Sequence, residues 1–295
     1  MSGIVDKIEQ YNEYLDSCYS PNTVQAYHRD VLDYCSFLTG YLGDENPEII
    51  ELNRLSVRHY IASLHRDGKS SSTIHRRIAS LSSFFEFLRR RGIVEINPAR
   101  GLARPKLKQG LPPFIAEKTL GQILDSLPDS TNVEIRDRAI IELFYGAGLR
   151  LAELIQLKLQ DFEGGGFIRV LGKGSKERII PIGRRAAEAL ENYLQIRKHL
   201  SHNENHDYFF LNSRGNKLER RFVQRRTKQL LKSISNDISP HDLRHAFATH
   251  MMRNGADLRA IQELLGHVNL TATQIYTHLC PSDLKKIYSQ THPRA

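Results

Sequence analysis

The stretch SPHDLRH at residues 239–245 is the most informative part of this sequence. Ser239 and Asp242 form the S-x-x-D pattern of a helix capping box. Pro240 suits the first position of a helix, where its missing N–H would have no partner. The stretch therefore predicts a helix that begins at Pro240.

His241 and Arg244 are three residues apart and hence share one face of the first turn of this helix. The free backbone N–H groups and the positive end of the helix dipole also favour an anion there. This spacing predicts a phosphate-binding face. An ion pair of Arg244 with an acid, and a capping role for His241, would be the plainer explanation of the same two residues.

A zinc site is a competing interpretation of His241, His245 and His250, because histidines four apart on a helix can share a metal. The chain has no H-E-x-x-H pattern, and His241 shares its face with the cation Arg244. We therefore expect no metal here.

The sequence downstream adds a second histidine and a tyrosine. Gly266 ends a predicted helix just before His267, and Tyr276 follows nine residues later. The chain contains 12 tyrosines, so Tyr276 taken by itself would more often be a packing residue than a nucleophile.

The sequence upstream adds a second arginine and a lysine. Gly146-Ala147-Gly148 breaks the chain and places Arg150 at the start of another helix. Two β-branched runs, residues 167–171 and 178–182, flank the glycine-rich segment 172–176 and predict a hairpin that carries Lys173. Two arginines, two histidines, a lysine and a tyrosine together suit phosphoryl transfer without a metal.

The first hundred residues read as helices. Helical spacing of apolar residues predicts helices at residues 4–19, 21–38, 56–66 and 72–91. Arg76 and Arg77 lie off the apolar stripe of the last of these, so we expect an exposed basic face.

Residues 97–113 lose this periodicity and collect proline, glycine and basic residues, which predicts a domain boundary. We expect one domain at 1–99, a basic linker at 100–113 and a second domain at 114–295. The linker could be simply solvated or could track a phosphate backbone. Further helices are predicted at residues 117–126, 132–145, 184–200, 219–233, 240–254, 258–264, 272–277 and 281–290.

The composition of the 295 residues points to nucleic acid, because the formal net charge is +9. The three cysteines are scattered and suit neither disulfides nor a thiolate zinc site. No apolar run is long enough to span a bilayer, and residues 1–10 do not resemble a secretory signal, so we expect a cytoplasmic protein. A phosphate-binding G-x-x-x-x-G-K-[ST] loop is missing, and we expect no nucleotide cofactor.

Five motifs occur together in one order: GLRLAEL at 148–154, GKGSKER at 172–178, HDLRH at 241–245, LGH at 265–267 and YTH at 276–278. In this they resemble the tyrosine recombinases of the phage-integrase family, and within it the Xer-type recombinases that resolve chromosome dimers. The resemblance spans nearly the whole chain, and the ending HPRA at 292–295 is also similar.

The resemblance implies that Arg150 and Arg244 clamp the scissile phosphate and stabilise its transition state in place of a metal. His241 and His267 would add hydrogen bonds or proton transfer at the same phosphate. A guanidinium suits the clamp, since it is permanently charged and can bind two phosphate oxygens at once.

The resemblance also implies that Tyr276 attacks the phosphate to give a 3′-phosphotyrosine, and that Lys173 protonates the departing 5′-oxygen. Glu153 is similar to the acid that supports the clamp in some relatives, although it could be a surface carboxylate. Residues expected to contact the DNA backbone are Arg76, Arg77, Lys106 and Lys176.

The implied architecture is mainly α with a small β-sheet in the catalytic domain, as a two-domain C-shaped clamp around duplex DNA. No cofactor, metal or membrane is implied. Four protomers, identical or of two related recombinases, would assemble on two DNA sites. A DNA translocase is a candidate activator of this assembly. Residues 282–290 carry an apolar edge, Leu284 and Ile287, that would dock on a neighbouring protomer or pack internally.

Three alternatives stay open at this point. A type IB topoisomerase shares the tyrosyl chemistry, but the small N-terminal domain favours recombination. A mobile-element integrase or transposase of the same family would use the same residues. A DNA-binding regulator without catalysis is disfavoured, because all six candidate catalytic residues are present.

Overall fold

A computed structural model describes residues 4–43, 51–106, 115–162, 164, 166–172, 177–200, 207–266 and 280–295. The chain divides into two compact units, Met1–Gly110 and Leu111–Ala295, and the division falls inside the segment where the sequence predicts a linker. Within the described residues, no helix is both long and apolar enough to cross a membrane.

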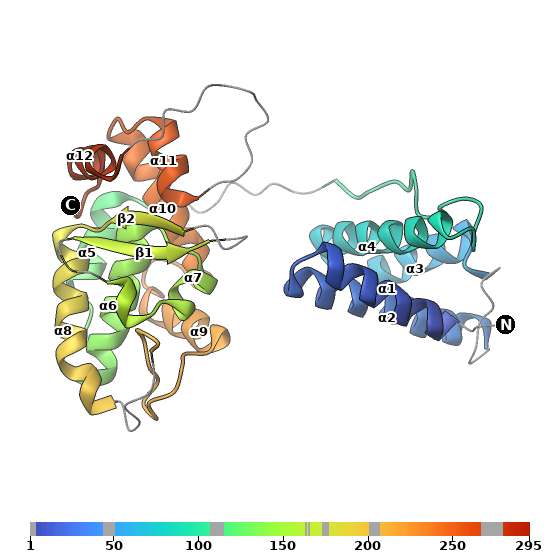
Figure 1. Ribbon diagram of the computed structural model, residues 1–295, viewed down its shortest axis with the longest axis horizontal. Helices are drawn as coiled ribbons and strands as arrows, with labels where there is room; N and C mark the ends of the chain where they lie inside the picture. Colours follow the sequence, from blue (N-terminus) through green and yellow to red (C-terminus); the bar gives the residue numbers. More distant parts are fainter. Residues whose placement is uncertain are drawn as a thin grey trace. The chain divides into compact units, whose positions relative to one another are not determined.

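The N-terminal unit is helical (Figure 1). Its described helices are α1 (Ile4–Cys18), α2 (Pro21–Leu42), α3 (Arg54–Arg66) and α4 (Ser71–Arg90). Each begins and ends within a few residues of its predicted bounds, with the largest difference at the end of α2. Pro21 occupies the first turn of α2 after the N-cap Ser20, as predicted, and Gly43 ends the helix in the left-handed conformation at φ 71°.

The core of this unit lies between α2, α4 and the helices beside them. Val31, Tyr34 and Leu38 of α2 are fully buried, and so are the apolar residues of the predicted stripe on α4. The amphipathic spacing therefore identified the inner faces correctly. Tyr27 and Phe37 have the same helical spacing but are only partly buried and pack at the margin of this core.

The predicted exposed basic face of α4 is wrong for Arg77, whose side chain is only 13% exposed. It donates to Asp33 at 2.7 Å and to the hydroxyl of Tyr60. Arg76 remains partly exposed but pairs with Asp30, a carboxylate that is itself buried in α2. The acids of α2 face α4, and a buried acid requires such a partner.

The C-terminal unit consists of helices around a two-stranded sheet. Its described helices are α5 (Glu117–Asp125), α6 (Asn132–Ala147), α7 (Leu151–Gln156), the 3₁₀ turn η2 (Leu159–Asp161), α8 (Arg184–Leu200), α9 (Arg220–Leu230), α10 (Pro240–Arg253), α11 (Leu258–Leu265) and α12 (Pro281–Thr291). The mainly helical class with a small sheet is confirmed. Predicted residues 272–277 lie outside the described part of the chain.

Strands β1 (Phe167–Leu171) and β2 (Glu177–Pro181) pair antiparallel. Phe167 lies opposite Pro181, and Leu171 lies opposite Glu177. The predicted hairpin is confirmed, and segment 172–176 connects the two strands. Lys173 and Lys176 in that connection lie outside the described residues.

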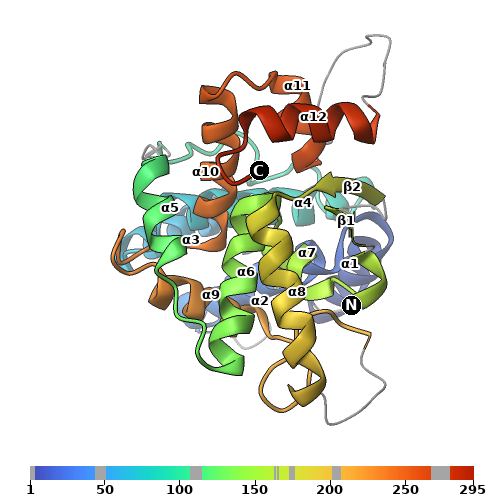
Figure 2. The ribbon, with the colours of Figure 1, turned by 90° about the vertical axis from the view of Figure 1, so that its left-hand side faces the viewer.

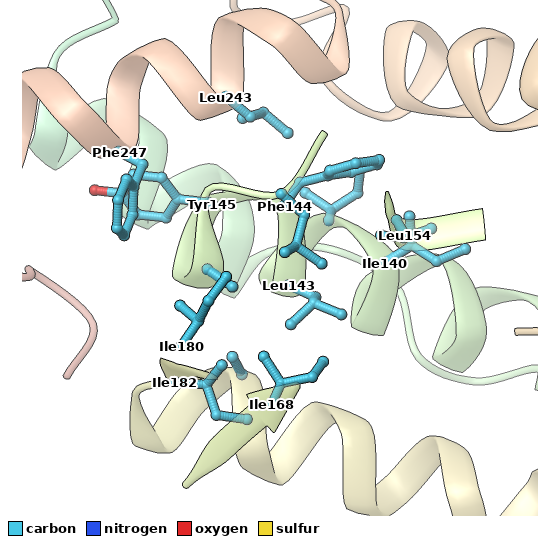
Figure 3. Close-up of a cluster of buried hydrophobic side chains, with 14 of the residues drawn as sticks. Ile140, Leu143, Phe144, Tyr145, Leu154, Ile168, Ile180, Ile182, Leu243 and Phe247 are labelled. Carbon is cyan, nitrogen blue, oxygen red and sulfur yellow. The ribbon is translucent and has the colours of Figure 1, made fainter. Parts of the chain in front are cut away.

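Helix α6 runs through the centre of this unit, side by side with α8 (Figures 1 and 2). Figure 3 shows its Leu143 and Phe144 between Leu243 of α10 on one side and Ile168 of the sheet on the other. All four are fully buried. The sheet and α10 are thus held on opposite sides of one helix, which fixes the elements that carry the candidate site.

The end of the chain packs on this same unit. Helix α12 contacts α10, α11 and β2 (Figure 2), and its Leu284 and Tyr288 are buried. Ile287 packs at the edge of the core. Of the two expectations for this apolar edge, internal packing is confirmed, and docking on a neighbouring protomer stays a prediction.

Candidate active site

Arg150 is positioned by a tight turn between α6 and α7. Gly148 ends α6 in the left-handed conformation at φ 59°, and Arg150 is the N-cap of α7, as predicted. A Cβ on Gly148 would lie 2.8 Å from the ring of Phe247 and 2.9 Å from Leu265. Only glycine therefore fits both the backbone conformation and the space at this turn.

The carboxylate of Glu153 stabilises this turn by hydrogen bonds to Arg150. It accepts the backbone N–H of Arg150 at 2.7 Å and the Nη1 of the same residue at 2.8 Å. Glu153 is buried, so the alternative of a surface carboxylate is wrong. The contact with Glu153 orients the Arg150 side chain. Since this side chain is still 40% exposed, it remains accessible to a ligand.

Arg244 is the second arginine of the site and is almost fully buried, with 6% of its side chain exposed. Its Nη1 donates to the carbonyl of Gly148 at 2.5 Å, and its Nη2 donates to that of Leu265 at 2.6 Å. Burial and the neighbouring charge of Arg150 lower the pKa of Arg244 to about 10, so it still carries its charge at neutral pH.

The start of α10 has the predicted capping interaction. The backbone N–H of Ser239 donates to Asp242 at 2.8 Å, and the Ser239 hydroxyl donates to the same oxygen at 2.6 Å. Pro240 begins the helix. His241 lies in its first turn and is exposed, so it is free to meet a ligand.

The two arginines converge, although they are 94 residues apart in the sequence. Arg150 Nη2 donates to the carbonyl of Gly266 at 3.3 Å, one residue beyond the carbonyl that Arg244 uses. Both therefore contact the end of α11. A phosphate beside this pair would meet permanently charged, prepositioned N–H donors, which stabilise a transition state that gains negative charge.

Sequence reasoning missed one member of this cluster, Arg178 of β2. Its Nη1 and Nη2 donate to the two oxygens of Glu153 at 3.0 and 2.9 Å, and its Nε donates to the carbonyl of Leu264 at 3.0 Å. Burial by itself would raise the pKa of Glu153, but the contacts with Arg178 and Arg150 outweigh it and hold this pKa below its usual value. The residue stood in the motif GKGSKER, whose pattern offers no sign of this contact.

His267 and Tyr276, like Lys173 and Lys176, lie outside the described residues. Lys106 is described and exposed at the end of the N-terminal unit.

The competing zinc interpretation fails at His250. Its Nδ1 lies 2.8 Å from the Tyr145 hydroxyl, and its Nε2 lies 2.8 Å from the carbonyl of Ile115. Both ring nitrogens are thus engaged, which leaves neither for a metal shared with His241 or His245. Across the described ranges, no group of three or more His, Cys, Asp or Glu side chains gathers to hold a metal.

A second basic surface lies on α9, which packs beside α7. Arg226 faces inward and donates to the buried Asp137 at 2.7 Å. The exposed basic residues of this surface are Arg220, Arg221, Arg225 and Lys228 of α9, and Lys232 just beyond the end of the helix. Their clustering in the sequence could have marked the surface beforehand, and it suits a polyanion.

A convergent arginine pair together with an exposed basic helix suits a class of proteins that act on the phosphates of a nucleic acid. The chain belongs to the phage integrase family, which residues 113–282 match, while residues 8–92 match the N-terminal SAM-like domain of phage integrases. This membership makes the chain a site-specific tyrosine recombinase and confirms the resemblance seen in the motifs.

The chain is similar to curated relatives over nearly its whole length. Tyrosine recombinase XerC of Pelotomaculum thermopropionicum is 38% identical over 286 residues, covering 94% of each chain. Tyrosine recombinase XerD of Listeria monocytogenes serotype 4b is 40% identical over 300 residues, covering 98% of this chain and 99% of the relative.

Solved structures share this fold. The XerH site-specific recombinase bound to its difH substrate before cleavage is 25% identical, with a TM-score of 0.61 over 82% of this chain and 71% of that one. A lambda integrase (75–356) dimer bound to a COC′ core site is 17% identical, with a TM-score of 0.70 over 94% of this chain and 100% of that one.

Proposed function

We propose that this recombinase cuts and rejoins duplex DNA through a 3′-phosphotyrosine at Tyr276, with Arg150 and Arg244 holding the scissile phosphate. The observation that carries the proposal is the convergence of the two guanidiniums on the end of α11, with Glu153 orienting Arg150. Arg244 is rigidly held and Arg150 is open, an arrangement suited to one anion between them.

The chemistry then needs only groups of the chain. The Tyr276 hydroxyl gives its proton to one of the two histidines as its oxygen attacks the phosphorus, the bond to the 5′-oxygen breaks, and Lys173 gives that oxygen its proton. His241 and His267 assist at the same phosphate. The phosphotyrosine keeps the energy of the broken phosphodiester, so the 5′-hydroxyl of another strand can reverse the step without ATP.

Basic residues outside the arginine pair bring the DNA to it. Arg76 and Lys106 of the N-terminal unit, Lys176 and the exposed face of α9 would contact phosphates, which agrees with the formal net charge of +9. Arg77 is a weaker candidate because its guanidinium is occupied by Asp33 and Tyr60.

Chromosome dimer resolution is the biological role that the relatives favour. Their names, XerC and XerD, recur at 38–41% identity over more than nine-tenths of this chain. The transposon integrase among the solved structures is 17% identical and supports only the fold. The active form would be a tetramer bound to two DNA sites in the cytoplasm, built from this protein alone or together with a second recombinase. A DNA translocase would activate it.

The test is a covalent protein–DNA adduct that survives denaturation. The wild-type protein, incubated with genomic fragments in EDTA, should form the adduct, and Tyr276→Phe should bind DNA equally but form none. Tyr208→Phe, another tyrosine of the same unit, is the matched control and should behave as wild type.

The adducted DNA also separates the alternatives. A regulator gives no adduct, and a topoisomerase relaxes plasmids without exchanging paired sites. Sequencing the trapped fragments should return one chromosomal locus for dimer resolution, whereas the ends of a mobile element would indicate integration. An adduct that persists in Tyr276→Phe would place the nucleophile elsewhere.

A further inference from the structure

Glu153 is shared unevenly by the arginines around it. Arg178 contacts both carboxylate oxygens through its two terminal nitrogens, whereas the Arg150 side chain contacts only Oε1. The nearest nitrogen of Arg244 is 3.8 Å from Oε2. Arg178 is therefore the principal counter-ion of the buried carboxylate.

Arg178 itself is turned toward the protein. Its side chain is 13% exposed, and Nε, Nη1 and Nη2 all donate to protein oxygens. It also lies against Gly266, where an added Cβ would be 3.0 Å from Nη1. Because three of its nitrogens donate to Glu153 and to the carbonyl of Leu264, this guanidinium is well placed to hold Glu153 in position.

The contact between Arg178 and Glu153 affects the net charge of the groups around a bound phosphate. With Arg178 present, three guanidiniums face one carboxylate, and the two that border the DNA site keep their net positive charge. Without Arg178, the negative charge of Glu153 would be balanced by Arg150 and Arg244. In a site of low dielectric, this would weaken their field at the phosphate.

We propose that Arg178 is a positioning residue for strand cleavage, which neutralises and orients Glu153 so that Arg150 and Arg244 remain available to the scissile phosphate. The inference rests on the proposed role of those two arginines. It assigns to β2 a part in the reaction that is separate from the lysine of the hairpin connection.

The experiment compares Arg178→Gln and Arg178→Lys with wild type in single-turnover cleavage of the trapped site. Arg178→Gln should cleave bound DNA about 10- to 100-fold more slowly, by analogy with the loss of a residue that orients a metal ligand. Site affinity in a gel shift should stay unchanged. Arg178→Lys keeps the charge without the two-pronged contact and should recover part of the rate.

Two further measurements separate an electrostatic role from a merely structural one. A methylphosphonate at the scissile position removes one negative charge from the transition state, so the penalty of Arg178→Gln should shrink several-fold on it. The double variant with Glu153→Gln should be no slower than the slower single variant, because the two residues act as a unit. Arg184→Gln, an exposed arginine at the start of α8, is the matched control.

The outcomes are distinguishable. The positioning role would be overturned if Arg178→Gln lost the same factor in cleavage rate on ordinary DNA and on the methylphosphonate substrate. It would also be overturned if the rate losses of the two single variants multiplied in the double variant. If Arg178→Gln does not fold, Arg178→Lys carries the same comparison of substrates. If wild type forms no adduct, the proposed function fails; if it does and Arg178→Gln is as fast, only this inference fails.

Discussion

Gly183 makes room for the end of the chain, and replacing it with alanine should dislodge that end. The residue lies between β2 and α8. A Cβ added there would be 2.0 Å from the carbonyl oxygen of Arg294 and 2.8 Å from the Cα of Ala295. Non-bonded carbon and oxygen atoms need about 3.5 Å, so the tail must shift by more than about 1 Å.

The shift would break a buried ion pair. Arg294 donates to Glu142 at 2.5 and 3.0 Å and to Asp125 at 2.9 Å. Asp125 is exposed and contributes little. Glu142 is buried, and leaving such a carboxylate unpaired costs about 3–5 kcal/mol. We expect Gly183→Ala to lose about 3 kcal/mol, which lowers the Tm of a unit of this size by roughly 6–12 °C.

The loss should also depend on pH. Burial raises the pKa of Glu142 above its usual value, and the charge of Arg294 opposes this rise. Without Arg294 the folded state binds a proton more readily than the unfolded chain. The loss is therefore greatest above the folded pKa and shrinks as pH falls through it, because a protonated carboxyl needs no counter-ion.

Calorimetry of the full chain at pH 8 and pH 5 would measure these effects. Arg294→Ala should show a similar drop, and the double variant should drop no further, since both changes act on the same tail. Gly40→Ala, in the N-terminal unit, is the control, because its added Cβ would also meet no atom within 4 Å. An unchanged Tm for Gly183→Ala, or additive losses, would refute the docked tail.

Two further predictions concern catalysis. Arg244→Ala should raise the activation free energy for cleavage of bound DNA by about 3–4 kcal/mol. It should change site affinity much less, because many basic residues share the phosphate contacts. If affinity is lost while bound DNA is cleaved normally, Arg244 is only a DNA contact. Lys173→Ala should cleave ordinary DNA slowly yet regain most of its rate when sulfur replaces the bridging 5′-oxygen, since a thiolate leaves without a proton. Rescue of Lys176→Ala instead would move the general acid to Lys176.

Local chemistry let the sequence predict much of this protein. The capping pattern of Ser239 and Asp242 places α10, and the glycines before Arg150 place α7, because a few neighbouring residues specify each of these turns. Apolar spacing located the N-terminal helices for the same reason. Both arginines of the candidate site were therefore predictable from short stretches.

Only the tertiary structure determined which charges meet. Glu153 and Arg178 are 25 residues apart, and Glu142 and Arg294 are 152 apart, so no local pattern relates them. Arg77 looked solvent-facing by helical position, yet the acids of α2 turn it inward. A buried carboxylate needs a cationic partner, and these partners are in place only once α7 has packed against β2 and α6 against the chain end.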